Sequence, residues 1–161
     1  MKTLLILRHA KAKRNGWDDR DRPLAKRGRH DAPLMGELIE RLDLVPHLVV
    51  TSDAKRARQT ARRVAEAAGY DDDIWLSEAL YLSSPQTHID ILRRLPDEAD
   101  IVMLVGHNPS LEDLVEALTG KLVDLLTSAL AHVELAIESW VELDEGAGKL
   151  VAVHYPSKDD Q

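Results

Sequence analysis

The chain contains 161 residues, no cysteine and a net charge of −7 at pH 7. This length suits one domain with a sizeable core. The lack of cysteine excludes disulfides, thiolate metal ligands and cysteine nucleophiles. Residues 1–7 form too short an apolar stretch for a signal peptide, and no later run reaches membrane-spanning length. We therefore expect a soluble, cytoplasmic protein without a membrane segment.

The charge is divided unevenly along the chain. Residues 1–63 contain 16 Lys and Arg against 8 Asp and Glu, whereas the remainder contains 5 against 20. Nucleic acid is disfavoured as a partner because there is no nucleic-acid motif, aromatic residues for stacking are few, and the acidic remainder repels a polyanion. The basic half is better explained by a local pocket for a small anionic group.

Four short apolar runs alternate with helical patterns. The runs cover residues 3–7, 48–50, 74–76 and 101–105. Apolar residues at helical spacing predict helices with one buried face around residues 35–42, 57–68 and 111–118. Such alternation is typical of a single α/β domain with a mainly parallel sheet.

Two of these helices carry signals for their ends. Pro33 either opens the first helix behind an Asp31 cap or bends a longer helix that starts near Ala25. Ser110, with an acidic residue three positions later, resembles a capping box at the start of the third helix, and Gly120 marks its end.

The C-terminal part predicts two further strands. Residues 133–141 and 149–153, joined by the turn 144–148, are typical of a β-hairpin. The polar residues 156–161 are then a tail, which leaves 1–155 as the domain.

Polar residues follow each of the four predicted parallel strands. Arg8 and His9 come after the first and residues 51–56 after the second, while Glu78 and the pair 106–107 follow the third and fourth. The carboxyl ends of strands in an open α/β sheet share one edge, where helix N-termini attract anions. We therefore expect these side chains to converge there.

The residue types favour phosphoryl transfer. Arg8 and Arg56 each offer a planar fork that donates two hydrogen bonds to phosphate oxygens. His9 is a candidate covalent nucleophile, provided that its attacking nitrogen is unprotonated. Neighbouring guanidinium groups lower the pKa of a histidine, so the same arginines keep His9 neutral. A metal site built from His9 and His107 is disfavoured, because adjacent arginines repel a cation.

Three segments carry a family resemblance: LLILRHAKA, SDAKRARQTA and VGHNPSLE. They resemble the signature segments of the histidine phosphatase superfamily, and the short length and DRDRPLAKRG are similar to its phosphohistidine phosphatase branch, the SixA type. The resemblance implies a three-layer α/β/α fold of the phosphoglycerate mutase kind and no metal or cofactor. It also implies that His9 is phosphorylated, that Arg8 and Arg56 hold the phosphate, and that His107 donates to it.

The sequence does not assign the general acid to a single residue. Glu78 lies near the position of the acidic residue of larger members, while Asp19, Asp21 and Ser128 are candidates for the pocket rim. The expected activity is hydrolysis of a phosphohistidine on a protein or peptide. A phosphatase for small-molecule or phosphopeptide monoesters and a weakly catalytic phosphohistidine-binding module are the alternatives. The segment AKAKRN lacks the mutase pattern of Ser and Asn, which argues against mutase activity.

Overall fold

In the computed structural model, which describes residues 1–156, a six-stranded mixed sheet forms the centre of the protein. The strand order is β3-β2-β4-β1-β5-β6. The first four are mutually parallel, and β5 runs antiparallel to both β1 and β6. The strands are β1 (Lys2–Arg8), β2 (Leu48–Ser52), β3 (Ile74–Ser77), β4 (Ile101–Gly106), β5 (Leu130–Leu135) and β6 (Gly148–His154). The prediction of a mainly parallel sheet is confirmed.

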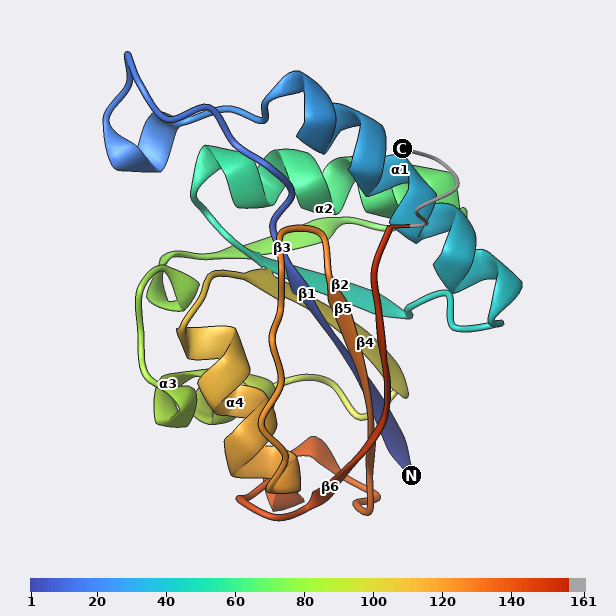
Figure 1. The fold of residues 1–161 in the computed structure, drawn as a ribbon. Helices are drawn as coiled ribbons and strands as arrows, with labels where there is room; N and C mark the ends of the chain where they lie inside the picture. Colours follow the sequence, from blue (N-terminus) through green and yellow to red (C-terminus); the bar gives the residue numbers. More distant parts are fainter. Residues whose placement is uncertain (157–161) are drawn as a thin grey trace.

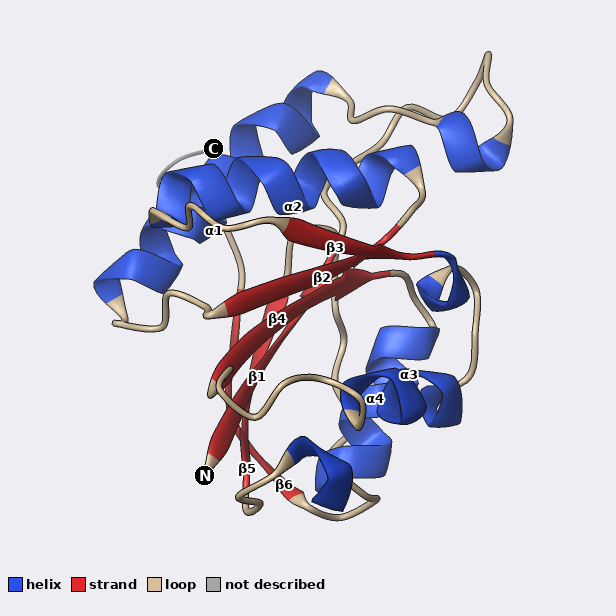
Figure 2. Ribbon diagram, turned by 180° about the vertical axis from the view of Figure 1, so that it is seen from behind, coloured by secondary structure: helices blue, strands red, loops and turns tan. Residues whose placement is uncertain are grey.

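Helices cover both faces of this sheet. One face carries α1 (Lys26–Arg41) and α2 (Lys55–Ala68), and the other carries α3 (Pro85–Leu92) and α4 (Ser110–Thr119), as Figures 1 and 2 show from opposite sides. The α/β/α layering is therefore confirmed. Helix α3 was not predicted, because its eight residues present too short a pattern to be recognised.

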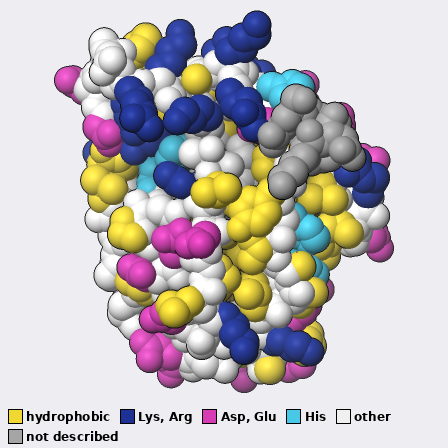
Figure 3. Space-filling model, viewed as in Figure 1, with side chains coloured by type: hydrophobic (Ala, Val, Ile, Leu, Met, Phe, Trp, Pro, Cys, Tyr) yellow, Lys and Arg dark blue, Asp and Glu magenta, His cyan; other side chains and the backbone are white. Residues whose placement is uncertain are grey.

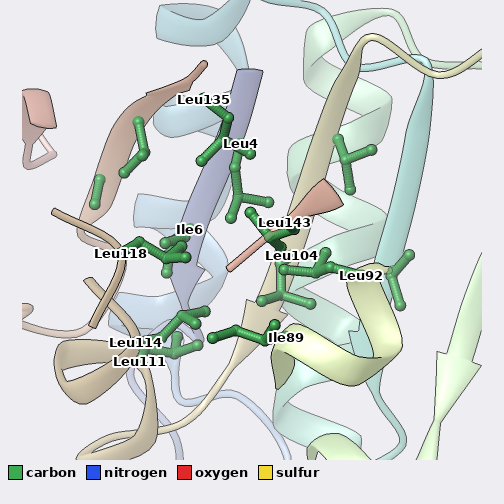
Figure 4. Packing of buried hydrophobic residues seen from close by; sticks show 14 of the residues in the cluster. Leu4, Ile6, Ile89, Leu92, Leu104, Leu111, Leu114, Leu118, Leu135 and Leu143 are labelled. Carbon is green, nitrogen blue, oxygen red and sulfur yellow. The ribbon is translucent and has the colours of Figure 1, made fainter. Parts of the chain in front are cut away.

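Side chains of the central strands alternate between two cores. Leu4 and Ile6 of β1 join the cluster beneath α3 and α4, part of which is drawn in Figure 4, while Leu5 and Leu7 face α1 and α2. All four are fully buried. Burying each such side chain contributes about 1.5–3 kcal/mol, so β1 is anchored from both sides and its carboxyl end is held in place.

Helix α1 continues through Pro33. It begins at Lys26, after an extended Ala25, so the longer of the two predicted helices is the one that forms. Asp31 is not a cap; it lies buried within the helix and its Oδ2 accepts a hydrogen bond from Arg27 Nε at 2.8 Å. A Cβ on Gly36 would lie 2.3 Å from the Val64 carbonyl oxygen, so this glycine allows α1 and α2 to approach closely.

The start of α4 differs from the prediction, whereas its end does not. Ser110 forms no capping box, because its hydroxyl donates to the Ser83 carbonyl. Asn108 Oδ1 instead accepts from the Glu112 amide at 3.3 Å. At the other end Gly120 adopts a left-handed conformation with φ of 75°, which confirms it as the terminating residue.

The C-terminal strands pair as predicted but do not form a tight hairpin. Strand β5 occupies Leu130–Leu135 rather than 133–141, and Leu135 pairs with Gly148. The connection between them is long because it carries Trp140 into the core, where its Nε1 donates to Ala99 O at 2.8 Å. Satisfying the indole N–H is what allows this side chain to be fully buried.

The predicted tail begins at Pro156, which is buried, and the rest of it, residues 157–161, lies outside the described residues. Among the described residues, no helix has the length and apolar character needed to cross a membrane.

Candidate active site

The carboxyl ends of three neighbouring strands bring four of the predicted residues together. His9 directly follows β1 and His107 follows β4, and their ring centroids are 5.3 Å apart. Arg56 lies in the first turn of α2, immediately beyond β2. Positive charge at both Arg8 and Arg56 acts on the pKa of His9. The expected convergence of distant segments is therefore present in the structure.

Hydrogen bonding assigns the proton of the His9 ring. Its Nδ1 lies 2.8 Å from the Ala10 carbonyl oxygen. A carbonyl only accepts, so Nδ1 carries the proton and Nε2 has the lone pair. Burial, which leaves 7% of the residue exposed, lowers the pKa of His9 to about 3, and the positive charges of Arg56 and Arg8 add to this effect. The ring is thus neutral near pH 7, with burial rather than the arginines as the main cause.

His107 is also buried and neutral. Its Nε2 lies 2.8 Å from the hydroxyl oxygen of Ser52, the last residue of β2. Its ring contacts that of Tyr81 in a T-shaped arrangement with centroids 5.3 Å apart. Burial lowers the pKa of His107 to about 4, the Arg56 charge contributes in the same direction, and Asp19 opposes both.

Several buried polar atoms at this edge of the sheet have no hydrogen-bond partner among residues 1–156. They are Nε of Arg8, Nε of Arg56, Nδ1 of His107 and the hydroxyl of Ser128. Buried polar groups are rarely unpaired, and leaving one unpaired costs about 1–3 kcal/mol. Two guanidinium N–H groups whose charge acts on His9, together with the lone pair of that neutral imidazole, are a set of groups suited to a tetrahedral oxyanion. The residues present fit an anionic substrate.

Asp19 occupies one side of Arg56. The two Arg56 amino groups donate to the backbone carbonyl of Asp19 at 2.6 Å and to its carboxylate at 3.1 Å. Tyr81 also donates its hydroxyl to that carboxylate, and this hydrogen bond is the main cause that lowers the pKa of Asp19. Asp19, one of the candidates for the pocket rim, is therefore an anion that orients Arg56.

The other rim candidates differ from one another. Glu78 follows β3 at the edge of the sheet, is exposed, and makes no side-chain hydrogen bond or ion pair with the described residues. Asp21 is likewise exposed. Ser128 is buried with φ of 68°, and its amide donates to the His9 carbonyl at 3.1 Å, so it lies directly beside the candidate nucleophile. A left-handed serine is strained, and such strain is often found at functional sites.

Sequence reasoning missed Tyr81. This residue lies after the short helix Glu78–Leu80 and contacts Asp19, while Arg20 and Arg56 lie 4.4 and 5.8 Å from its ring centroid. No spacing in the sequence links Tyr81 to the charged loop. Only the folded chain brings an aromatic ring against two guanidinium groups, a contact that stabilises them by cation–π attraction.

The surface charge agrees with an anion site. Figure 3 shows Lys and Arg gathered over the upper part of the molecule, where the strands end, whereas Asp and Glu are more frequent lower down. A predominance of positive charge near a binding site raises the local concentration of a negatively charged substrate.

Comparisons with known proteins agree with this geometry. The family model described as Histidine phosphatase superfamily (branch 1) matches residues 4–81, which include Arg8, His9 and Arg56. The uncharacterized protein Rv1276c of Mycobacterium tuberculosis is 32% identical over 162 residues, which cover 93% of this chain and 99% of that protein.

Solved structures extend the likeness to the whole length. A candidate phosphohistidine phosphatase SixA from Agrobacterium tumefaciens is 28% identical with a TM-score of 0.80, covering 97% of this chain and 99% of that chain. The protein histidine phosphatase SixA complexed with tungstate superposes with a TM-score of 0.85 at 24% identity, covering 96% of this chain and 97% of that chain, which supports the fold. The chain belongs to the histidine phosphatase superfamily, and its likeness to the SixA type is confirmed. It is a phosphatase.

Proposed function

We propose that the protein hydrolyses phosphohistidine on a protein or peptide through a phosphoryl group carried by His9. The observation that supports this most directly is the lone pair on His9 Nε2, together with buried nitrogens of Arg8, Arg56 and His107 that have no hydrogen-bond partner among residues 1–156. In this proposal Nε2 attacks phosphorus, the bond from phosphorus to the substrate nitrogen breaks, and that nitrogen takes up a proton from solvent water. Water then attacks the phosphoryl group on His9 and releases phosphate.

The two arginines hold the phosphoryl group and neutralise its charge in this reaction. Phosphoryl transfer depends mainly on positioning and on neutralising charge at the three equatorial oxygens. Arg8 is fixed by donating to Leu125 O at 3.0 Å, and Arg56 is fixed by Asp19, so both guanidinium groups are held before substrate binds. Preorganised donors of this kind avoid the cost of reorganisation during the reaction.

The state of the nearby carboxylates favours a nitrogen leaving group. The Tyr81 hydrogen bond lowers the pKa of Asp19, so Asp19 carries no proton to donate near pH 7. Glu78 is exposed and makes no side-chain hydrogen bond with the described residues. A departing imidazole needs less protonation than an alkoxide, whose departure a general acid typically accelerates by about 10²–10⁴-fold. This difference favours phosphohistidine over phosphate monoesters.

Two peptides of identical sequence test the proposal. One carries phosphohistidine and the other phosphoserine at the same position, and phosphate release is measured with wild type and with His9→Ala. We expect kcat/KM to be about 10²-fold higher for phosphohistidine, which is the contribution of the acid that an ester requires. Equal turnover of both peptides, or a preference for phosphoserine, would identify a monoester phosphatase instead. Binding of the phosphohistidine peptide without phosphate release would identify a binding module.

A further inference from the structure

Ser52 is a fully buried serine whose hydroxyl has two partners. Its Oγ lies 3.2 Å from the Ala54 amide nitrogen and 2.8 Å from His107 Nε2. It is the last residue of β2, and its position is set by the strand and by the first turn of α2. No further hydrogen bond of this hydroxyl is present among the described residues.

The two contacts determine where the hydroxyl proton goes. The Ala54 amide can only donate, so Ser52 Oγ accepts from it. The hydroxyl has one proton of its own, and the only hydrogen-bond acceptor that residues 1–156 offer it is a ring nitrogen of His107. If Ser52 donates to Nε2, that nitrogen holds the lone pair and the ring proton lies on Nδ1.

We propose that Ser52 is a positioning residue that holds His107 in the Nδ1–H tautomer, so that Nδ1–H donates to an oxygen of the transferring phosphoryl group. The inference rests on the proposed function and assigns the role of a residue that does not itself touch substrate. His107 is 2% exposed, and its Nδ1 is buried without a partner among residues 1–156, as expected for a group that donates to an anion. The opposite tautomer would direct a lone pair at the phosphoryl oxygens, which is repulsive.

Because His107 is neutral, its tautomer decides whether Nδ1 can donate a hydrogen bond to the phosphoryl group. A charged imidazolium donates from both nitrogens and would need no serine, whereas a neutral ring donates from one only. Because burial keeps His107 neutral, the choice between its two nitrogens falls to its hydrogen-bond partner. An exchange of the proton between the nitrogens therefore converts a donor into a repulsive group without moving any atom of the backbone.

Nitrogen-15 NMR of the ring nitrogens reads the tautomer directly in the resting protein. We expect the His107 Nδ1 signal of wild type to be that of a protonated nitrogen and to shift when inorganic phosphate is added. In Ser52→Ala we expect a mixture of His107 tautomers. We also expect kcat on the phosphohistidine peptide to fall by about tenfold or more, because one preorganised donor is partly lost. Ser52→Thr keeps the hydroxyl and should retain the wild-type tautomer and the wild-type kcat.

Ser110→Ala is the matched control, since it removes another buried serine hydroxyl, whose one hydrogen bond among residues 1–156 is to the Ser83 carbonyl. It should leave the His107 signals and kcat unchanged. A wild-type His107 protonated on Nε2 would overturn the inference, and so would a Ser52→Ala protein with unaltered tautomer and kcat. Should that variant fail to fold, the wild-type spectrum alone decides. The tautomer is read in the resting protein and does not depend on turnover. If wild type shows the Nδ1–H signal but does not hydrolyse phosphohistidine, the proposed function fails while the tautomer assignment stands.

Discussion

Burial of His9 should make the folded state sensitive to mild acid. Its pKa is about 3 in the folded protein and about 6.5 in an unfolded chain, so the unfolded state binds a proton first as the pH falls. The stability that neutral His9 contributes is therefore fully present above pH of about 6.5 and is lost progressively as the pH falls towards 3. At pH 5 the titration of this residue alone lowers the free energy of unfolding by up to about 2 kcal/mol relative to its value above pH of about 6.5.

Urea unfolding of wild type and His9→Asn at pH 7 and pH 5 measures this effect. The free energy of unfolding of wild type should fall by up to about 2 kcal/mol more than that of the variant, which has no imidazole to titrate at this position. Leu122→Ala, at a residue that is 83% exposed, is the control and should follow wild type. If wild type and His9→Asn lose the same stability, His9 titrates like an exposed histidine and the argument from burial is wrong.

Three further outcomes are expected. Arg56→Ala should lower kcat/KM about 100-fold or more, as loss of a preorganised donor does, and a loss below about threefold would show that Arg56 does not hold the phosphate. Gly36→Ala should lower the free energy of unfolding by about 1–3 kcal/mol, because its Cβ would lie 2.3 Å from Val64 O; an unchanged Tm would contradict the close approach of α1 and α2. Glu78→Gln should reduce kcat on the phosphohistidine peptide by less than about tenfold, whereas a loss of about 10² or more would identify Glu78 as the general acid.

The convergence of the site could be predicted because it depends on topology more than on detail. Parallel strands place their carboxyl ends at one edge, so the position of His9 and His107 immediately after two apolar runs is enough to bring them to that edge. The alternation of strand and helix patterns gives the layers by the same reasoning. Arg56 follows β2 at the start of a helix, and that helix was evident from its alanine-rich buried face.

The errors occur where tertiary contacts override local signals. Ser110 has the spacing of a cap, yet the Ser83 carbonyl takes its hydroxyl and Asn108 takes its role. Strand β5 begins at Leu130 rather than 133, because pairing with β1 aligns Leu130 with Leu7 and thereby sets the register. A single sequence contains no signal for either partner.

The charged loop after β1 was the part least open to prediction. Its residues have no period, and Asp19 gains its role only by contacts with Arg56 and Tyr81, which lie 37 and 62 positions away. The tautomers of His9 and His107 depend likewise on a backbone carbonyl and on a serine of another strand. The sequence pattern indicated which residues form the candidate anion site, but the positions of its protons required the folded chain.

Mapping the phosphoryl group on the enzyme tests the central claim most directly. The protein is mixed with a phosphohistidine peptide, quenched in alkali, which preserves a bond between phosphorus and nitrogen, and analysed by peptide mass spectrometry. We expect one acid-labile phosphoryl group on His9, absent in His9→Ala, which should also lose turnover. A phosphoryl group on a different residue, or hydrolysis that persists in His9→Ala, would contradict the account.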